Sequence, residues 1–185
     1  MKVTITGPRS VGKTSISKIV ARKLKLKYIS SDHLGNDAFR VYGGLDKAMK
    51  SGKVLESIKS GGYSLIINTY KKDNFVFDLS GGSFTSNKTP KLTLEVRKVA
   101  RKRSIVIGLL PSKNPDESIN LLFERERKRE HFKDMDPKDL FEKTKVSYSN
   151  FPDTFNEFCN LVVYTENKTP EAIAKEIVHF IMSKK

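Results

Sequence analysis

The sequence predicts an α/β fold of three layers, in which helices cover both faces of a central parallel sheet of about five strands. Short apolar segments alternate with amphipathic ones along the 185 residues, a length typical of one domain. A glycine-rich loop joins the first predicted strand to the first predicted helix. Because parallel strands need crossover connections, usually helices, this alternation favours a parallel sheet. We expect residues 1–185 to form a single domain.

The elements follow from the spacing of apolar side chains, which alternate or run together in strands and recur every three to four residues in helices. The predicted strands are residues 1–7, 27–31, 75–79, 104–110 and 161–165. The predicted helices are residues 13–26, 93–102, 115–129 and 170–182, with one or two more within 37–60. The apolar segment 64–68 could be a strand or the end of a helix.

The chain is strongly basic, with 35 Lys and Arg against 21 Asp and Glu, a formal net charge of +14. An anionic partner is therefore expected: nucleic acid, an acidic membrane surface or a phosphorylated small molecule. Aromatic residues do not interleave with the basic clusters as they do in stacking platforms, so nucleic acid is possible but not favoured.

The single cysteine, Cys159, excludes an intrachain disulfide. No apolar run reaches the roughly 18 residues of a membrane span, and we expect a cytoplasmic monomer without a membrane partner.

Residues 7–14, GPRSVGKT, fit the phosphate-loop pattern GxxxxGK[ST], with a predicted strand before it and a predicted helix after it. Glycines let successive backbone N–H groups converge on a phosphate, and the helix N-terminus adds partial positive charge. Lys13 would bridge the β- and γ-phosphates, and the Thr14 hydroxyl would ligate Mg²⁺. The alternative is a glycine turn that happens to precede Lys-Thr. The expected nucleotide-binding residues are Gly7, Pro8, Arg9, Ser10, Val11, Gly12, Lys13, Thr14 and Ser15.

Asp78 ends the apolar segment Phe-Val-Phe-Asp, as does the second carboxylate that holds Mg²⁺ in phosphate-loop proteins. The alternative is an Asp that caps the end of a strand. Residues 78–81 also spell the DxxG of GTPases, but a GTPase needs an NKxD motif farther on. Both NKTP segments, at Asn87 and Asn167, have Pro where that Asp belongs. The expected ligands are therefore ATP and Mg²⁺, with Thr14 and Asp78 as the metal residues.

Three motifs in this order resemble the shikimate kinases and the related small nucleoside-monophosphate-type kinases. After the phosphate loop, residues 28–32 (YISSD) are similar to the family's short strand that ends Asp-x-Asp, with Ser30 in place of the first Asp. Residues 80–82 (Ser-Gly-Gly) are similar to its Gly-Gly-Gly segment. The resemblance implies a P-loop kinase fold with a helical lid, here at approximately residues 125–137.

The same resemblance implies roles for individual residues. The acceptor would be bound by Asp32 and by the backbone of Gly81 and Gly82. Lys59 lies one position out of register from a substrate-binding Arg of the family, and Lys143 or Lys145 precedes Tyr148 as a second such Arg does. Catalysis would involve Lys13, Asp32 and an arginine of the lid. The candidates for that arginine are Arg125, Arg127 and Arg129, of which we select Arg127.

The implied activity is transfer of the γ-phosphoryl group of ATP to a small hydroxylated acceptor. One alternative is a nucleoside monophosphate kinase. Another is a phosphate-loop nucleotide-binding protein or slow NTPase that associates with nucleic acid through its positive charge. For Asp32 the alternative is a helix N-cap, and for the arginine-rich segment it is a solvated helix face that includes Glu124, Glu126 and Glu130.

Overall fold

The structure is a computed structural model that describes residues 1–38, 40, 43, 47 and 63–184. Within this part of the chain, five parallel strands form one sheet in the order β2-β3-β1-β4-β5. The strands are β1 (Lys2–Thr6), β2 (Lys27–Ser30), β3 (Phe75–Asp78), β4 (Ile105–Leu110) and β5 (Leu161–Tyr164). The predicted α/β fold with about five parallel strands is confirmed.

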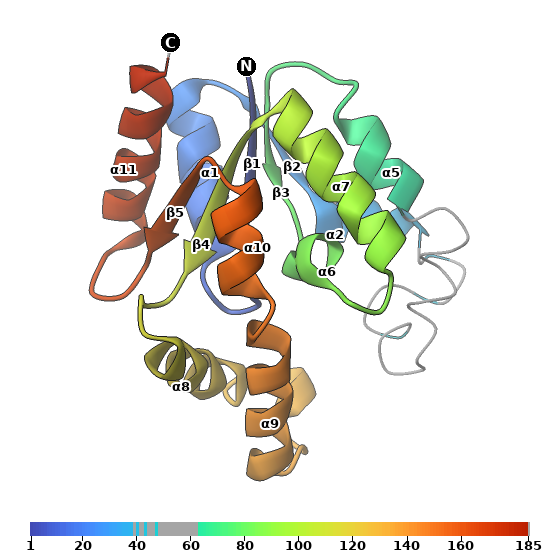
Figure 1. The fold of residues 1–185 in the computed structure, drawn as a ribbon, viewed down its shortest axis with the longest axis vertical. Helices are drawn as coiled ribbons and strands as arrows, with labels where there is room; N and C mark the ends of the chain where they lie inside the picture. The colour runs from blue at the N-terminus through green and yellow to red at the C-terminus, as the bar shows by residue number, and fades with distance from the viewer. Residues whose placement is uncertain (39, 41–42, 44–46, 48–62, 185) are drawn as a thin grey trace.

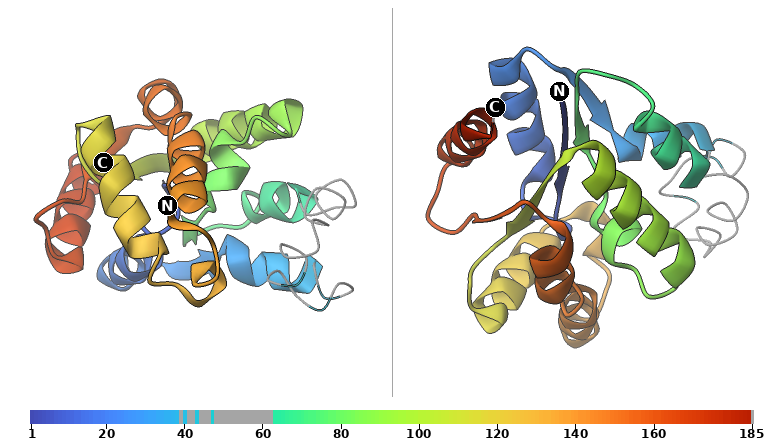
Figure 2. Two further views of the ribbon diagram at one scale, coloured as in Figure 1. Left: turned by 90° about the horizontal axis from the view of Figure 1, so that it is seen from below. Right: turned by 45° about the horizontal axis from the view of Figure 1, so that its top comes forward.

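Helices cover both faces of this sheet, as Figures 1 and 2 show. One face carries α1 (Lys13–Leu24) and α11 (Pro170–Ser183), which pack against each other. The other face carries α7 (Pro90–Arg103) and α10 (Phe151–Phe158), and both contact β4. Buried apolar residues therefore line both sides of the strands, as expected for a parallel sheet enclosed by helices.

The strands of the sheet supply many of the fully buried side chains of the core. Val3 and Ile5 of β1 are fully buried, as are Phe75 and Phe77 of β3. The two phenylalanine rings of β3 meet edge to face, with centroids 6.4 Å apart. Because β1 is the central strand of the sheet and is buried, the loop that follows it begins at a firmly packed position.

Two further helices lie beyond the carboxyl ends of the strands (Figure 1). These are α8 (Pro115–Glu126) and α9 (Pro137–Tyr148), which contact each other and are joined through the 3₁₀ turn η3 (Glu130–Phe132). The predicted lid, approximately residues 125–137, corresponds to the connection between these helices. None of the described helices is long and apolar enough to cross a membrane.

The structure also resolves or changes several sequence expectations. Residues 64–68 lie in a helix, α5 (Tyr63–Thr69), which packs beside α7. The long helix expected over 115–129 ends at Glu126, and the predicted Ser-Gly-Gly turn opens the short helix α6 (Gly81–Thr85). Helix α2 (Ser31–Ala38) follows β2 directly. Most of the predicted helical region 37–60 lies outside the described residues.

Candidate active site

The glycine-rich loop leaves the end of β1 and enters α1 at Lys13. Gly12 has φ 100°, which only glycine adopts without strain, and Ser10 has φ 65° in the left-handed region. A Cβ on Gly7 would lie 2.6 Å from the carbonyl oxygen of Leu109, so this residue must be glycine for the loop to pass β4. The loop therefore has the strand-loop-helix geometry that the phosphate-loop motif requires.

Lys13 folds back over the loop. Its Nζ donates hydrogen bonds to the carbonyl oxygens of Gly7 and Pro8, both at 2.9 Å. The ammonium group thus lies against the backbone of the loop. In phosphate-loop proteins the lysine at this position binds phosphate oxygens.

The charges around Lys13 come from several elements. Burial lowers the pKa of Lys13 below its ordinary value, the carboxylates of Asp78 and Asp32 act in the opposite direction, and Arg129 and Arg9 lower the pKa further. Two acids and two guanidinium groups therefore lie within electrostatic range of this amine. Such convergence is typical of a site for an anion and its counter-ion.

Asp78, at the end of β3, is buried and binds two hydroxyl groups through one oxygen. Its Oδ2 accepts from Thr14 Oγ1 at 2.8 Å and from Tyr28 Oη at 3.0 Å. Burial and the negative charge of Asp78 raise the pKa of Tyr28 to about 12, so the phenol stays a donor at neutral pH. The two strands β2 and β3 and the helix α1 thus meet at this carboxylate.

The loop fits a nucleotide phosphate group. The Ser10 Oγ is buried without a hydrogen-bond partner, and a buried hydroxyl normally has one. The described residues contain no cluster of three or more His, Cys, Asp and Glu side chains suited to a metal. Thr14 and Asp78, which share a hydrogen bond beside the loop, are the residues that would hold Mg²⁺ together with phosphate oxygens, as in phosphate-loop proteins.

Asp32 lies beside this centre because β2 and β3 are paired neighbours. Ser30 is in register with Asp78, and Asp32 follows it in the first turn of α2. The Asp32 N–H donates to Ser30 Oγ at 3.2 Å, and the Ser80 N–H donates to Ser31 Oγ at 2.8 Å. Asp32 itself is exposed. The predicted acceptor residue and the start of the Ser-Gly-Gly segment therefore lie together at one edge of the sheet.

The two glycines of that segment have different surroundings. Gly81 is buried, and a Cβ there would meet the Gly7 carbonyl oxygen and would lie 2.7 Å from Phe151 Cζ. Gly82 is exposed, and a Cβ there would have nothing within 4 Å. The absence of a side chain at Gly81 lets α6 pack against both the phosphate loop and α10. Gly82 is the glycine of this segment that is accessible.

The predicted lid arginines also differ. Arg127 Nε pairs with Glu124 Oε2 at 3.0 Å on the outer part of α8, and its side chain is 55% exposed. Arg125 Nη1 donates to the carbonyl oxygen of Ser10 at 3.3 Å, whereas Arg129 acts electrostatically on Lys13. The hydrogen bond to the loop therefore comes from Arg125, and the electrostatic effect on Lys13 comes from Arg129, whereas Arg127 pairs with Glu124.

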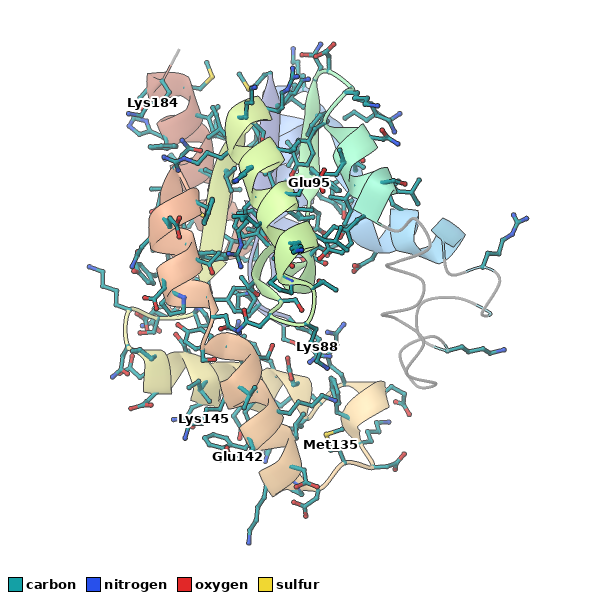
Figure 3. The ribbon with its side chains drawn as sticks, turned by 45° about the vertical axis from the view of Figure 1, so that its right-hand side comes forward. Lys88, Glu95, Met135, Glu142, Lys145 and Lys184 are labelled. Carbon is teal, nitrogen blue, oxygen red and sulfur yellow. The ribbon has the colours of Figure 1, made fainter. Side chains whose placement is uncertain are left out.

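One of the predicted acceptor residues is not brought to this centre. Lys145 is exposed on α9, on the same helix as Glu142 and away from the sheet (Figure 3). Lys59 lies outside the described residues.

Two residues of the site were not found by sequence reasoning. Tyr28 and Ser30 are two positions apart along β2, so strand periodicity places both side chains on one face of the strand. That this face meets Asp78 follows only from the pairing of β2 with β3. Glu126 lies in a mixed-charge run that is typical of a solvated surface, yet only 3% of it is exposed. Its place seven residues after Ile119 and four after Leu122, on the buried stripe of α8, is the helical-spacing signal that could have found it.

The fold and this loop define a P-loop kinase fold of the shikimate kinase type. Among solved structures, the chain is similar to shikimate kinase from Acinetobacter baumannii in complex with shikimate, with a TM-score of 0.72 and 18% identity over 100% of this chain and 94% of that one. It is also similar to shikimate kinase from Bacteroides thetaiotaomicron, with a TM-score of 0.73 and 14% identity over 98% of each chain. A gluconokinase from Sinorhizobium meliloti 1021 has a TM-score of 0.56 and 15% identity over 100% of this chain and 97% of its own. No protein-family model and no curated protein matches the sequence.

Proposed function

We propose that this protein is an ATP-dependent kinase that transfers the γ-phosphoryl group to a small hydroxylated acceptor. The observation that carries the proposal is the hydrogen bond between Thr14 and Asp78, next to a loop in which Lys13 Nζ donates to the carbonyl oxygens of Gly7 and Pro8. A structural glycine turn would not need a hydroxyl and a buried carboxylate paired in this way. The similarity of the fold to shikimate kinases and a gluconokinase supports a small-molecule acceptor.

In this proposal each residue has a limited task. Lys13 and the N–H groups of the loop bind the β- and γ-phosphates, while Thr14 and Asp78 hold Mg²⁺. Bound Mg²⁺ would neutralise charge that develops on the phosphates. Asp32 orients the acceptor hydroxyl or takes its proton, and an arginine near η3 balances charge on the transferred group. Phosphoryl transfer relies mainly on positioning and electrostatics, which explains why no nucleophilic side chain is needed.

Residues 28–32 depart from the family pattern at the first Asp of the Asp-x-Asp motif. Ser30 stands where the resemblance places the first Asp, and Tyr28 supplies the second hydroxyl on Asp78. The similarity of the fold to shikimate kinases and a gluconokinase nevertheless supports a hydroxylated acid as the class of acceptor.

The test is ATP consumption by the full chain with shikimate, gluconate and each nucleoside monophosphate in parallel wells. We expect acceptor-dependent turnover with one of the hydroxylated acids and none with the Lys13→Ala variant. Turnover only with a nucleoside monophosphate would assign the alternative kinase class. If no acceptor stimulated turnover and the protein bound RNA or DNA tightly in a salt-sensitive way, the kinase proposal would be wrong.

A further inference from the structure

Arg9, in the phosphate loop, is held by residues that lie outside that loop. Its Nε donates to Glu126 Oε1 at 2.9 Å, at the end of α8. Its guanidinium carbon lies 4.5 Å from the centroid of the Phe132 ring, a cation–π contact. One edge and one face of the guanidinium group are therefore fixed by the segment that connects the sheet to α9.

Glu126 is itself fixed on its other side. Its side chain is 5% exposed, and its Oε2 accepts a hydrogen bond from Thr144 Oγ1 of α9 at 3.2 Å. The Thr144 hydroxyl also donates to the Leu140 carbonyl oxygen at 2.8 Å, so its single proton is shared between these two acceptors. A buried carboxylate is tolerated only when it is paired and hydrogen-bonded, and Glu126 meets both conditions through Arg9 and Thr144.

This arrangement prepares Arg9 to bind phosphate. The guanidinium group is planar, and because Glu126 accepts from Nε, the N–H groups of the two terminal nitrogens remain available as a fork that suits two phosphate oxygens. Arg9 also lies within electrostatic range of the Lys13 ammonium. Because a phosphate-loop lysine reaches the β- and γ-phosphates, Arg9 lies at that end of the nucleotide site.

We propose that Arg9 binds the γ-phosphate of the nucleotide and that Glu126 and Thr144 are positioning residues that hold its guanidinium group in place. The inference rests on the proposed function in one respect, because it requires that the loop binds a nucleoside triphosphate. It adds a residue that distinguishes ATP from ADP, and two residues on α8 and α9 that act through it.

The test measures the dissociation constants of ATP and ADP for the full chain by titration calorimetry in the presence of Mg²⁺. The quantity of interest is the preference for ATP, the ratio of the ADP constant to the ATP constant. The wild type should prefer ATP. Arg9→Lys keeps the charge but loses the fork, and Glu126→Gln keeps the shape but loses the ion pair. Each should reduce the preference about tenfold or more, as expected for a charge-assisted hydrogen bond.

Thr144 provides a finer test in case Glu126→Gln does not fold. Thr144→Val removes the hydroxyl at nearly constant shape and should reduce the ATP preference by a smaller factor, whereas Thr144→Ser keeps the hydroxyl and should restore it. The matched control is Glu176→Gln, which breaks the exposed pair between Lys168 and Glu176 at 2.7 Å and should leave the preference unchanged.

The outcomes separate this inference from the proposed function. An unchanged ATP preference in folded Arg9→Lys and in the Thr144→Val variant would overturn the inference and would leave a purely structural ion pair. Equal dissociation constants of ATP and ADP for the wild type would overturn the inference as well. If the wild type bound neither nucleotide, or if Lys13→Ala bound both as well as the wild type does, the proposed function itself would fail.

Discussion

Ser10 combines two costs in a single residue. Its φ of 65° is in the left-handed region, and its hydroxyl is buried without a hydrogen-bond partner. Backbone strain and unpaired polar groups of this kind persist where the surrounding structure imposes them, most often at functional sites. A phosphate oxygen in the loop would give the hydroxyl its missing acceptor.

The variant Ser10→Ala tests this interpretation. The nucleotide-free protein should be as stable as the wild type, or more stable by up to about 1 kcal/mol, because an unpaired buried hydroxyl is removed. The affinity for ATP should fall about tenfold, because a hydrogen bond to a charged phosphate is lost. Denaturant unfolding and calorimetry measure the two effects.

A matched control for Ser10→Ala exists in α1. Ser17 is also buried with an unpaired hydroxyl, but it lies beyond the phosphate loop. Ser17→Ala should therefore change stability in the same direction without any loss of ATP affinity. Unchanged ATP affinity in Ser10→Ala would show that the serine hydroxyl does not bind phosphate.

Asp32 is the residue on which the acceptor role depends most. With the acceptor that the panel of compounds identifies, Asp32→Asn should reduce kcat by about a hundredfold or more, the usual loss when a general base is removed. The KM for ATP should change little, and Asp73→Asn, at an exposed carboxylate that pairs with Lys2, serves as the control. Full turnover by Asp32→Asn in steady-state assays would remove this residue from the mechanism.

At the residue scale, the sequence predicted the loop side chains but not their partners. The phosphate-loop pattern identifies Lys13 and Thr14, because chemistry and spacing are local. The bond between Tyr28 and Asp78 depends on the pairing of β2 with β3, and the bond between Arg9 and Glu126 joins residues that are 117 positions apart. Such contacts arise from tertiary packing, for which a single sequence carries no direct signal.

At the scale of elements, α6 joins the phosphate loop to α10 through Gly81. A methyl group at Gly81 would meet both the Gly7 carbonyl oxygen and the Phe151 ring. We expect Gly81→Ala to lower the free energy of unfolding by about 1–3 kcal/mol through overpacking and to weaken ATP binding, since the loop must move. Thermal unfolding with and without ATP measures both effects.

Gly82 is the control for this prediction, because a Cβ there would extend into open space. Gly82→Ala should keep the stability of the wild type within about 0.5 kcal/mol. Equal stability of the two variants would contradict the packing that the structure shows around Gly81.

The elements that the sequence predicted best are those with strong apolar periodicity. The strands and α1, α7 and α11 follow their patterns, with small shifts at their ends. Helices α9 and α10 were not predicted, because their charged residues and closely spaced aromatic residues obscure the helical repeat. The segment 64–68 was ambiguous because a short apolar run fits a strand or a helix, and packing of α5 against α7 decides for the helix.

At the scale of the whole molecule, stability should depend on alkaline pH. Burial raises the pKa of the Cys159 thiol from 9.0 to about 12, with Arg101 acting in the opposite direction. The folded state then keeps a proton that the unfolded state releases. This contribution to stability is complete below about pH 9 and is lost between about pH 9 and 12, by up to about 1.4 kcal/mol per pH unit.

The measurement compares the wild type with Cys159→Ala in denaturant unfolding at several pH values. The unfolding free energy of the wild type minus that of Cys159→Ala should be constant below pH 8 and should decrease steadily above pH 9. The comparison is needed because the raised pKa of Tyr28 also destabilises the fold at high pH, whereas the lowered pKa of Lys13 acts in the opposite sense. Parallel curves up to pH 11 would contradict the predicted protonation of the thiol.

The net charge of +14 is only partly explained by the site. Arg9 and Arg129 lie close enough to Lys13 to lower its pKa, and a triphosphate would balance these three charges. The remaining excess is distributed over the chain, so charge is a weaker guide to function than the geometry around Asp78.

The most direct test of the central claim follows the phosphorus atom itself. The protein would be incubated with ATP labelled in the γ-phosphate, Mg²⁺ and the small-molecule fraction of a cell extract, and the labelled products would be separated. Transfer of label to a small organic acceptor by the wild type, and its loss in Lys13→Ala, is the expected result. Label that appears only as inorganic phosphate, at the same rate with and without the extract, would contradict the account.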